Sequence, residues 1–291
     1  MNPENEQTFL LNNLLRNRID RSNGWIPFDL FFNTVMYEPG LGYYSSGSYK
    51  IGEGGDYTTA PEISKYFSKS IANQTMRLLD MHDSPSVIEI GAGKGTFAFE
   101  YLKALEEGKT EIEHYYILEI SADLRDRQMQ LISGLPEDLK NKVTWLESLD
   151  IEPIDGIVLA NEVIDALPFK RFCIENKQVY ELGITYSDGA FKVSKKESSK
   201  KLRDQVEAIS VEIERKIEDG FTSEIRLDFH KWFRSISSLI RKGSMIFIDY
   251  GYDRNDFYRP IKIIPVIPII CLLYTSPSPR DRTRSRMPSS A

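Results

Sequence analysis

The chain has 291 residues, of which 41% are hydrophobic and 27% charged, so it can bury a full core as one large domain or two small ones. Its net charge of −6 gives no overall attraction to nucleic acid, and we do not expect DNA or bulk RNA as a partner. The two cysteines and three histidines show no metal-ligand spacing, so we expect neither disulfides nor a metal site.

The first part of the chain, residues 1–84, is predicted to be a helical cap with a lid loop. Amphipathic patterns indicate helices over residues 4–20 and 28–37, and a third from Pro61 to Met81 with proline in its first turn. The N-terminus has early acidic residues and no long apolar run, so it resembles neither a secretory signal nor a transit peptide. We therefore expect a cytoplasmic protein.

Strands and helices alternate in the middle of the chain, which is predicted to form a doubly wound α/β domain over residues 85–260. The pattern predicts a parallel sheet with helices on both faces and ligands at the carboxyl ends of its strands. We expect a hairpin and helices inserted at about residues 170–225. Predicted strands cover residues 87–90, 115–120, 143–146, 156–160 and 245–252; predicted helices cover 96–107, 121–132, 198–218 and 225–242.

A glycine-rich loop follows the first of these strands in the sequence VIEIGAGKGTF, residues 87–97. The spacing of Gly91, Gly93 and Gly95 does not fit a P-loop, and the third glycine comes one position too early for a dinucleotide fingerprint. Glycines let the backbone turn sharply and touch a ligand. The spacing indicates S-adenosylmethionine, with a ligand-free turn as the alternative. Lys94 is predicted to be a solvated surface residue.

Further candidate cofactor contacts follow the next two strands. Glu119 ends the second strand, 24 residues after Gly95, where a nucleotide site of this kind places an acid that accepts both ribose hydroxyls. The alternative is a surface glutamate. We expect the adenine near Ser148 and Leu149, after the third strand.

The fourth strand leads into the sequence LANEVIDALPFKRF, residues 159–172, which holds Asn161, Glu162 and Asp165. If this segment is helical, the two acids share one face. One interpretation is a helix N-terminus that Asn161 caps and the acids stabilise through the helix dipole. The other is a catalytic site in which the carboxylates grip a guanidinium by parallel hydrogen bonds.

Six motifs in order resemble the MidA family of S-adenosylmethionine-dependent methyltransferases, over roughly residues 5–260. The motifs are GLGYY, GGDYTTAPEIS, GAGKGTF, ILEIS, ANEVIDALPFKRF and IDYGY. Mitochondrial members of that family are complex I assembly factors and protein arginine methyltransferases. The resemblance implies a class I methyltransferase fold and cofactor roles for the glycine loop and Glu119. It also implies that Thr58, Thr59, Pro61 and Glu62 help to close the cofactor pocket.

We therefore expect S-adenosylmethionine as cofactor and an arginine-bearing protein as substrate, which by family analogy is a respiratory complex I subunit. Glu162 would bind the guanidinium, with Asp165 and Asn161 assisting. Two alternatives stay open: a methyltransferase for RNA or a small amine, and a non-catalytic S-adenosylmethionine-binding assembly factor.

The end of the chain, residues 261–291, departs from the family, whose members continue into further strands of the sheet. An apolar run broken by Pro265 and Pro268 gives way to a segment rich in Ser, Pro and Arg. The run is too short and too interrupted to span a bilayer, and the ending resembles translated sequencing adapter on a truncated reading frame. We expect residues 265–291 to form no regular part of the core, which would leave the strand at Met245–Asp249 as an exposed sheet edge.

Overall fold

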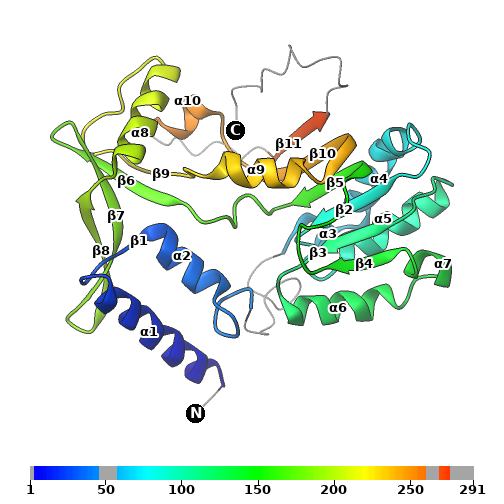
Figure 1. Cartoon of the computed structure of the whole chain (residues 1–291), viewed down its shortest axis with the longest axis horizontal. Helices are drawn as coiled ribbons and strands as arrows, with labels where there is room; N and C mark the ends of the chain where they lie inside the picture. Colours follow the sequence, from blue (N-terminus) through cyan, green and yellow to red (C-terminus); the bar gives the residue numbers. More distant parts are fainter. Residues whose placement is uncertain (1–2, 46–57, 260–268, 276–291) are drawn as a thin grey trace.

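A computed structural model describes residues 3–45, 58–259 and 269–275 of the chain (Figure 1). Two sheets organise them, one of six strands and one of five. The six-stranded sheet and its helices lie on one side of the view in Figure 1, and the second sheet lies on the other.

The six-stranded sheet has the strand order β11-β10-β5-β2-β3-β4, and all its pairings are parallel except that of β11 with β10. The chain runs outward from β2 to β3 and β4, then crosses to β5 on the other side of β2. The point where the strand order reverses therefore lies between β2 and β5, which is where open α/β sheets bind ligands. The bounds are β2 Ser86–Ile90, β3 Tyr115–Leu118, β4 Val143–Leu146, β5 Ile154–Asn161 and β10 Ile240–Tyr250.

Helices cover both faces of this sheet because alternate strand residues point to opposite sides. Val87 belongs to the apolar cluster that includes α4 and α5, whereas Ile88 belongs to the cluster that includes Ile236 of α9. The doubly wound α/β fold predicted from the sequence is confirmed. The helices are α4 Lys65–Leu79, α5 Thr96–Glu107, α6 Ala122–Ile132, α7 Glu137–Lys140 and α9 Phe229–Ser237.

The inserted region forms an antiparallel sheet in the order β1-β7-β6-β9, with β8 paired to β7. Its β1 comes from the N-terminal part of the chain, so that part and the insertion are joined in one sheet. Helices α1 and α2 border one apolar cluster of this sheet, and α8 borders another. The bounds are α1 Pro3–Arg21, β1 Ile26–Pro27, α2 Phe28–Tyr37, β6 Lys170–Glu175, β7 Gln178–Ser187, β8 Ala190–Glu197, α8 Lys200–Glu212, β9 Thr222–Ile225 and α10 Arg254–Phe257.

Three predicted helices have different bounds in the structure, and the one expected over residues 198–218 ends at Glu212. The helix expected from Pro61 to Met81 is interrupted at Ser64, which ends α3 (Ala60–Ile63) and caps α4 by accepting a hydrogen bond from the Tyr66 backbone N–H at 3.2 Å. The serine side chain offers the backbone an alternative to the helical hydrogen bond. The helix expected over residues 225–242 is shorter, because its first residue belongs to β9 and its last residues begin β10.

The C-terminal prediction was wrong for part of its range. Residues Ile269–Thr275 form β11, which pairs antiparallel with β10 from Ser244 to Tyr250. A strand edge presents unpaired backbone N–H and C=O groups, and the run IICLLYT is rich in residues that favour strands, so pairing is the physical reason for the difference. The rest of the predicted tail, residues 261–268 and 276–291, lies outside the described residues.

No helix in the described ranges is long and apolar enough to cross a membrane.

Candidate functional site

The carboxyl edge of the parallel sheet brings together the residues that the sequence singled out. The glycine loop follows β2, Glu119 follows β3, Ser148 and Leu149 follow β4, and Asn161 ends β5. Because parallel strands end at the same edge, these residues face one region although they span 70 positions in the chain, from Gly91 to Asn161.

The glycine loop adopts a backbone that side chains disfavour. Gly91, Gly93 and Gly95 have φ angles of +67°, +55° and +88°. A Cβ on Gly91 would lie 3.0 Å from Val163 Cγ2, and one on Gly95 would lie 3.2 Å from Gln128 Cγ. The left-handed conformation therefore explains all three glycines, and the lack of space adds to it at Gly91 and Gly95. The loop contacts the segment after β5 directly, through Gly91 and Val163.

Glu119 is held in place by hydrogen bonds and is only 6% exposed. Its Oε1 accepts the Ser121 backbone N–H at 2.9 Å, and its Oε2 accepts the side-chain amide of Gln128 at 3.2 Å. Burial raises the pKa of Glu119, and these hydrogen bonds oppose that rise. The Ile120 backbone also donates to this carboxylate, and a carboxylate has about four acceptor positions, so Glu119 can still accept a hydroxyl donor.

Gln128 is a site residue that the sequence analysis missed. Its side chain is fully buried in α6, and its Nε2 donates to the Gly93 carbonyl at 2.7 Å as well as to Glu119. Its Oε1 accepts the Trp145 indole N–H at 2.8 Å. The indole is only a donor and the carbonyl only an acceptor, so these partners fix the orientation of the amide. Gln128 thus joins the glycine loop, the end of β3 and β4.

The segment after β5 is a loop, which contradicts the helix N-terminus considered for it. Glu162 has a φ angle of +51°, and its backbone N–H donates to the Ile248 carbonyl at 2.8 Å. No helix includes residues 161–169, so Asn161 does not cap one and the acids do not share a helix face. The hydrogen bond to β10 is a tertiary contact that overrides the local helical pattern.

Asp249, at the end of β10, fixes the shape of this loop and was also missed. Its Oδ2 accepts the backbone N–H groups of Ile164 at 2.8 Å and Asp165 at 3.1 Å. Asp249 itself is buried, with 8% of its surface exposed. Tyr37 of α2 also supports the loop, because its hydroxyl donates to the Ala166 carbonyl at 2.5 Å. An acid that ends an apolar strand was the available signal for Asp249.

Three carboxylates, those of Glu162, Asp165 and Asp249, interact at this loop. Partial burial raises the pKa of Glu162, with a further rise from the charges of Asp165 and Asp249. Partial burial and then the charge of Asp249 raise the pKa of Asp165. A group of acids that resist ionisation together favours a cation among them, because the cation offsets their mutual repulsion.

Two contacts connect Glu162 and Asn161 to their surroundings. The Glu162 carboxylate accepts a hydrogen bond from the backbone of Ala60 in α3 and another from the Asn161 side chain. The Asn161 Oδ1 atom is buried and has no hydrogen-bond partner in the described parts of the chain. A buried oxygen of this kind is expected to accept a hydrogen bond from a ligand or a water.

The short helix α3 carries the residues implied to close the cofactor pocket. Thr59 precedes it as N-cap without a side-chain hydrogen bond, Pro61 is buried, and Thr58 is exposed. Glu62 lies 3.8 Å from Lys94 of the glycine loop. Lys94 is 17% exposed, so the prediction of a solvated lysine was wrong: the ion pair holds its side chain against α3. Residues 50–57 of the predicted lid lie outside the described residues.

Ser148 and Leu149 lie at the carboxyl end of β4, as predicted from their position. Ser148 is exposed and accepts the Asp150 backbone N–H at 3.2 Å, while Leu149 packs against the apolar layer beneath α9. Their role as adenine contacts stays a prediction.

These residues fit an S-adenosylmethionine-like ligand. The glycine loop offers bare backbone, Glu119 offers two acceptor oxygens, and Asn161 offers a buried oxygen without a partner. Such a set suits a nucleoside with an amino-acid tail and contains no phosphate cradle.

Comparison with known families agrees with this geometry. The family model described as S-adenosyl-L-methionine-dependent methyltransferase matches residues 70–263, which is more than half of the chain. The chain belongs to the MidA family of these methyltransferases. The MidA resemblance and the class I methyltransferase fold predicted from the sequence are confirmed, and S-adenosylmethionine is confirmed as the cofactor of the family.

Solved structures of MidA-like proteins cover most of the chain. A COG1565 superfamily member from Burkholderia thailandensis, crystallised with S-adenosyl-homocysteine, is 31% identical with a TM-score of 0.82. The match covers 89% of this chain and 66% of that one. A second crystal structure of a protein from the same organism is 29% identical, with a TM-score of 0.78.

Curated relatives match a smaller part of the chain. The mitochondrial protein arginine methyltransferase NDUFAF7 homolog of Drosophila melanogaster is 30% identical over 60% of this chain. The human NDUFAF7 is 24% identical over 52% of the chain. The matched region spans 45% of the fly protein and 40% of the human one.

Proposed function

We propose that this chain binds S-adenosylmethionine at its glycine loop and Glu119 and transfers the methyl group to an arginine side chain of a protein. Membership of the MidA family supports the cofactor, as does the Burkholderia thailandensis relative that was crystallised with S-adenosyl-homocysteine. The names of the curated relatives support a protein arginine substrate.

The observation that carries the proposal is the contact between the glycine loop and the loop after β5, residues 162–169, which we call the acid loop. A Cβ on Gly91 would lie 3.0 Å from Val163, the residue that follows Glu162. The two loops meet at the reversal point of the sheet, between β2 and β5. A cation held by Glu162 and Asp165 would therefore lie beside a cofactor bound on the glycine loop.

In this proposal the protein contributes alignment and charge. S-adenosylmethionine supplies an electrophilic methyl group on a sulfonium, so the protein has to place a nucleophile in line with it and exclude water. Glu162 accepts hydrogen bonds from the protonated guanidinium and directs one of its nitrogens toward the methyl group. Asp165 adds a second carboxylate, and Asn161 orients Glu162 through its side-chain contact.

The carboxylates of Glu162 and Asp165 can also accept the proton that methylation releases. A nitrogen that gains a methyl group loses a proton, and the substrate remains a singly charged methylguanidinium. The raised pKa values of Glu162 and Asp165 suit them to accept that proton and pass it to water.

The acceptor protein is proposed from the family alone. The resemblance to MidA proteins suggests a subunit of respiratory complex I. The names of the curated relatives place those proteins in mitochondria; a cytoplasmic location for this chain stays the prediction made from its sequence.

Labelled methyl transfer tests the proposal. The chain, and in parallel the Burkholderia thailandensis relative, is incubated with S-adenosylmethionine labelled in its methyl group and a dialysed cell extract. The extract proteins are then hydrolysed and their amino acids separated. We expect label in methylarginine. Label in RNA or in small amines would support the corresponding alternative, and S-adenosyl-homocysteine binding without any transfer would support the non-catalytic one.

A further inference from the structure

A pocket of about 260 Å³ lies at the C-terminal end of the acid loop, where Leu167, Pro168 and Phe169 line it. Its walls come from the end of that loop, from α2, and from the segment that leads into α9; they include Pro168, Phe169, Phe229 and Trp232. The volume is below the roughly 300–1,000 Å³ of small-molecule sites, so the pocket suits a single large side chain.

Aromatic rings that pack against other aromatic rings form much of the pocket wall. The Phe169 ring packs at 5.3 Å from that of Phe28, and the Trp232 ring packs at 5.7 Å from Phe229 and 5.8 Å from Phe247. Phe169, Phe229 and Trp232 are all only partly buried. Fixed aromatic surface that stays open to solvent favours an aromatic or large aliphatic occupant.

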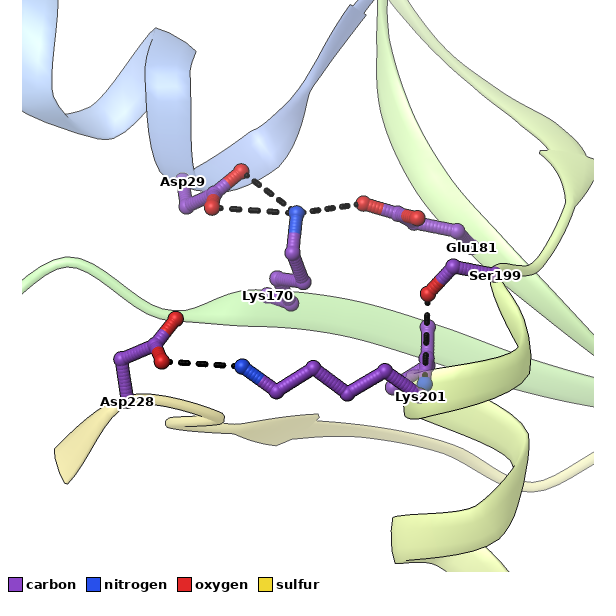
Figure 2. Close-up of polar contacts among 7 residues, drawn as sticks. Asp29, Lys170, Glu181, Ser199, Lys201 and Asp228 are labelled. Carbon is purple, nitrogen blue, oxygen red and sulfur yellow. Dashed lines mark hydrogen bonds and ion pairs between the residues drawn. The ribbon is translucent and has the colours of Figure 1, made fainter. Parts of the chain in front are cut away.

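Most charges around the pocket already have partners. Lys170 Nζ lies between the carboxylates of Asp29 on α2 and Glu181 on β7, at 3.0 Å and 2.7 Å (Figure 2). The carboxylate of Asp228 lies 2.8 Å from Lys201 Nζ, as Figure 2 also shows. These groups stabilise the walls, and none of them leaves an uncompensated acid for a cationic ligand.

Arg226 is different. Its guanidinium lies 5.6 Å from the centre of the Phe169 ring and donates to the carbonyls of Asp165 and Leu167, both at 3.4 Å. Within the described ranges of the chain no carboxylate lies within 4.0 Å of its guanidinium, although its charge lowers the pKa of Asp165. Two of its nitrogens already donate to these carbonyls, and its remaining Nη N–H groups, beside an open pocket, can pair with a carboxylate.

The pocket and the proposed acceptor site share one loop. Phe169 follows Asp165 by four residues, which limits their separation to about 14 Å even in a fully extended chain. Arg226 binds the backbone of Asp165 itself. A peptide can therefore occupy the pocket and reach the acids within about four of its own residues.

We propose that this pocket anchors the protein that carries the methyl acceptor. It takes an aromatic or large aliphatic side chain, next to an Asp or Glu that pairs with Arg226, about four residues from the acceptor arginine. This inference rests on the proposed function, because it places the anchor beside a site for an acceptor protein.

Peptide binding tests the anchor without requiring catalysis. Fluorescein-labelled peptides of sequence Phe-Glu-Gly-Gly-Arg, Gly-Glu-Gly-Gly-Arg and Phe-Lys-Gly-Gly-Arg are titrated with the chain, saturated with S-adenosyl-homocysteine, and followed by anisotropy. We expect the first to bind at least tenfold more tightly than either of the others. Arg226→Glu should reverse the preference between the Glu and Lys peptides, whereas Arg234→Glu, on the exposed side of α9, should not.

Each outcome has one consequence. Equal affinity for the Phe and Gly peptides, or the same change in both arginine variants, would overturn the anchor. Full competition by the free acid phenylpropionate at the same concentration as the peptide would also overturn it, because the pocket would then be a small-molecule site. If the predicted preferences hold but labelled S-adenosylmethionine transfers nothing to the bound arginine, the anchor stands and the proposed arginine chemistry fails.

Discussion

The amide Nε2 of Gln128 lies 3.2 Å from Oε2 of Glu119, so a fully buried amide orients the carboxylate that we assign to the cofactor ribose. The same nitrogen donates to the Gly93 carbonyl, which couples the ribose site to the glycine loop. Without Gln128, Oε2 of Glu119 and the Gly93 carbonyl would each lose this donor, and a buried acceptor that loses a hydrogen bond costs stability.

Gln128→Glu should weaken S-adenosyl-homocysteine binding by roughly 10- to 100-fold, because it places a second carboxylate against Glu119 and removes a donor to a charged group. The affinity of this variant should also rise as the pH falls, since a proton shared by the two acids restores a hydrogen bond. Titration calorimetry at several pH values measures both effects. Gln130→Glu is the matched control on the exposed side of α6. An equal loss in both variants would contradict the assignment.

Gly93→Val should abolish S-adenosyl-homocysteine binding, because a branched side chain enters the surface where backbone meets ligand. The left-handed φ angle of +55° adds a strain of about 1–2 kcal/mol. Gly189→Val carries similar strain at a φ angle of +78°, in the open turn between β7 and β8. We expect this control to lower the melting temperature without a loss of affinity. Unchanged affinity in the Gly93 variant would exclude the glycine loop as the cofactor site.

The stability of the fold should fall as the pH rises from about 4.5 to 8, with Glu89 as one cause. Burial raises the pKa of Glu89 to about 8 from 4.5, although the Tyr115 hydroxyl donates to it at 2.7 Å. Between these two pKa values the folded state keeps the Glu89 proton, whereas the unfolded chain has lost it. The contribution of Glu89 to the free energy of unfolding is therefore complete below pH 4.5 and is lost as the pH rises through 8.

Glu89→Gln should remove that part of the pH dependence. Each titrating group contributes up to about 1.4 kcal/mol per pH unit in its window. Urea unfolding of the wild type and the variant from pH 4 to 9 measures the difference. We expect the two curves of unfolding free energy to diverge with rising pH in favour of the variant. Parallel curves would show that Glu89 does not stay protonated in the fold.

Local sequence spacing was enough to predict the elements on which the cofactor site depends. The glycine loop and Glu119 each sit at a strand end, and the rule that parallel strands end together places them at one edge. The position of Ser148 followed from the same rule. These predictions needed no knowledge of which side chains touch.

The remaining features depend on contacts between distant segments. Glu162 leaves the helical conformation because its N–H bonds to Ile248 in β10, and nothing near it in the chain indicates this. In the sequence Gln128 is one of several polar residues in an amphipathic helix. Only its burial in the structure shows that it supports the glycine loop and Glu119. Likewise, β11 forms because β10 offers an edge to an apolar segment that two prolines precede.

The central claim is that Glu162 serves the acceptor and not the cofactor. Its most direct test is Glu162→Gln with two readouts: calorimetric affinity for S-adenosyl-homocysteine, and the rate of labelled methyl transfer to protein arginine. Glu152→Gln, exposed in the loop before β5, is the control. We predict unchanged affinity and a loss of transfer on the order of 100-fold in the Glu162 variant alone. Equal losses of affinity and transfer would contradict the account, because they would make Glu162 a support of the cofactor site.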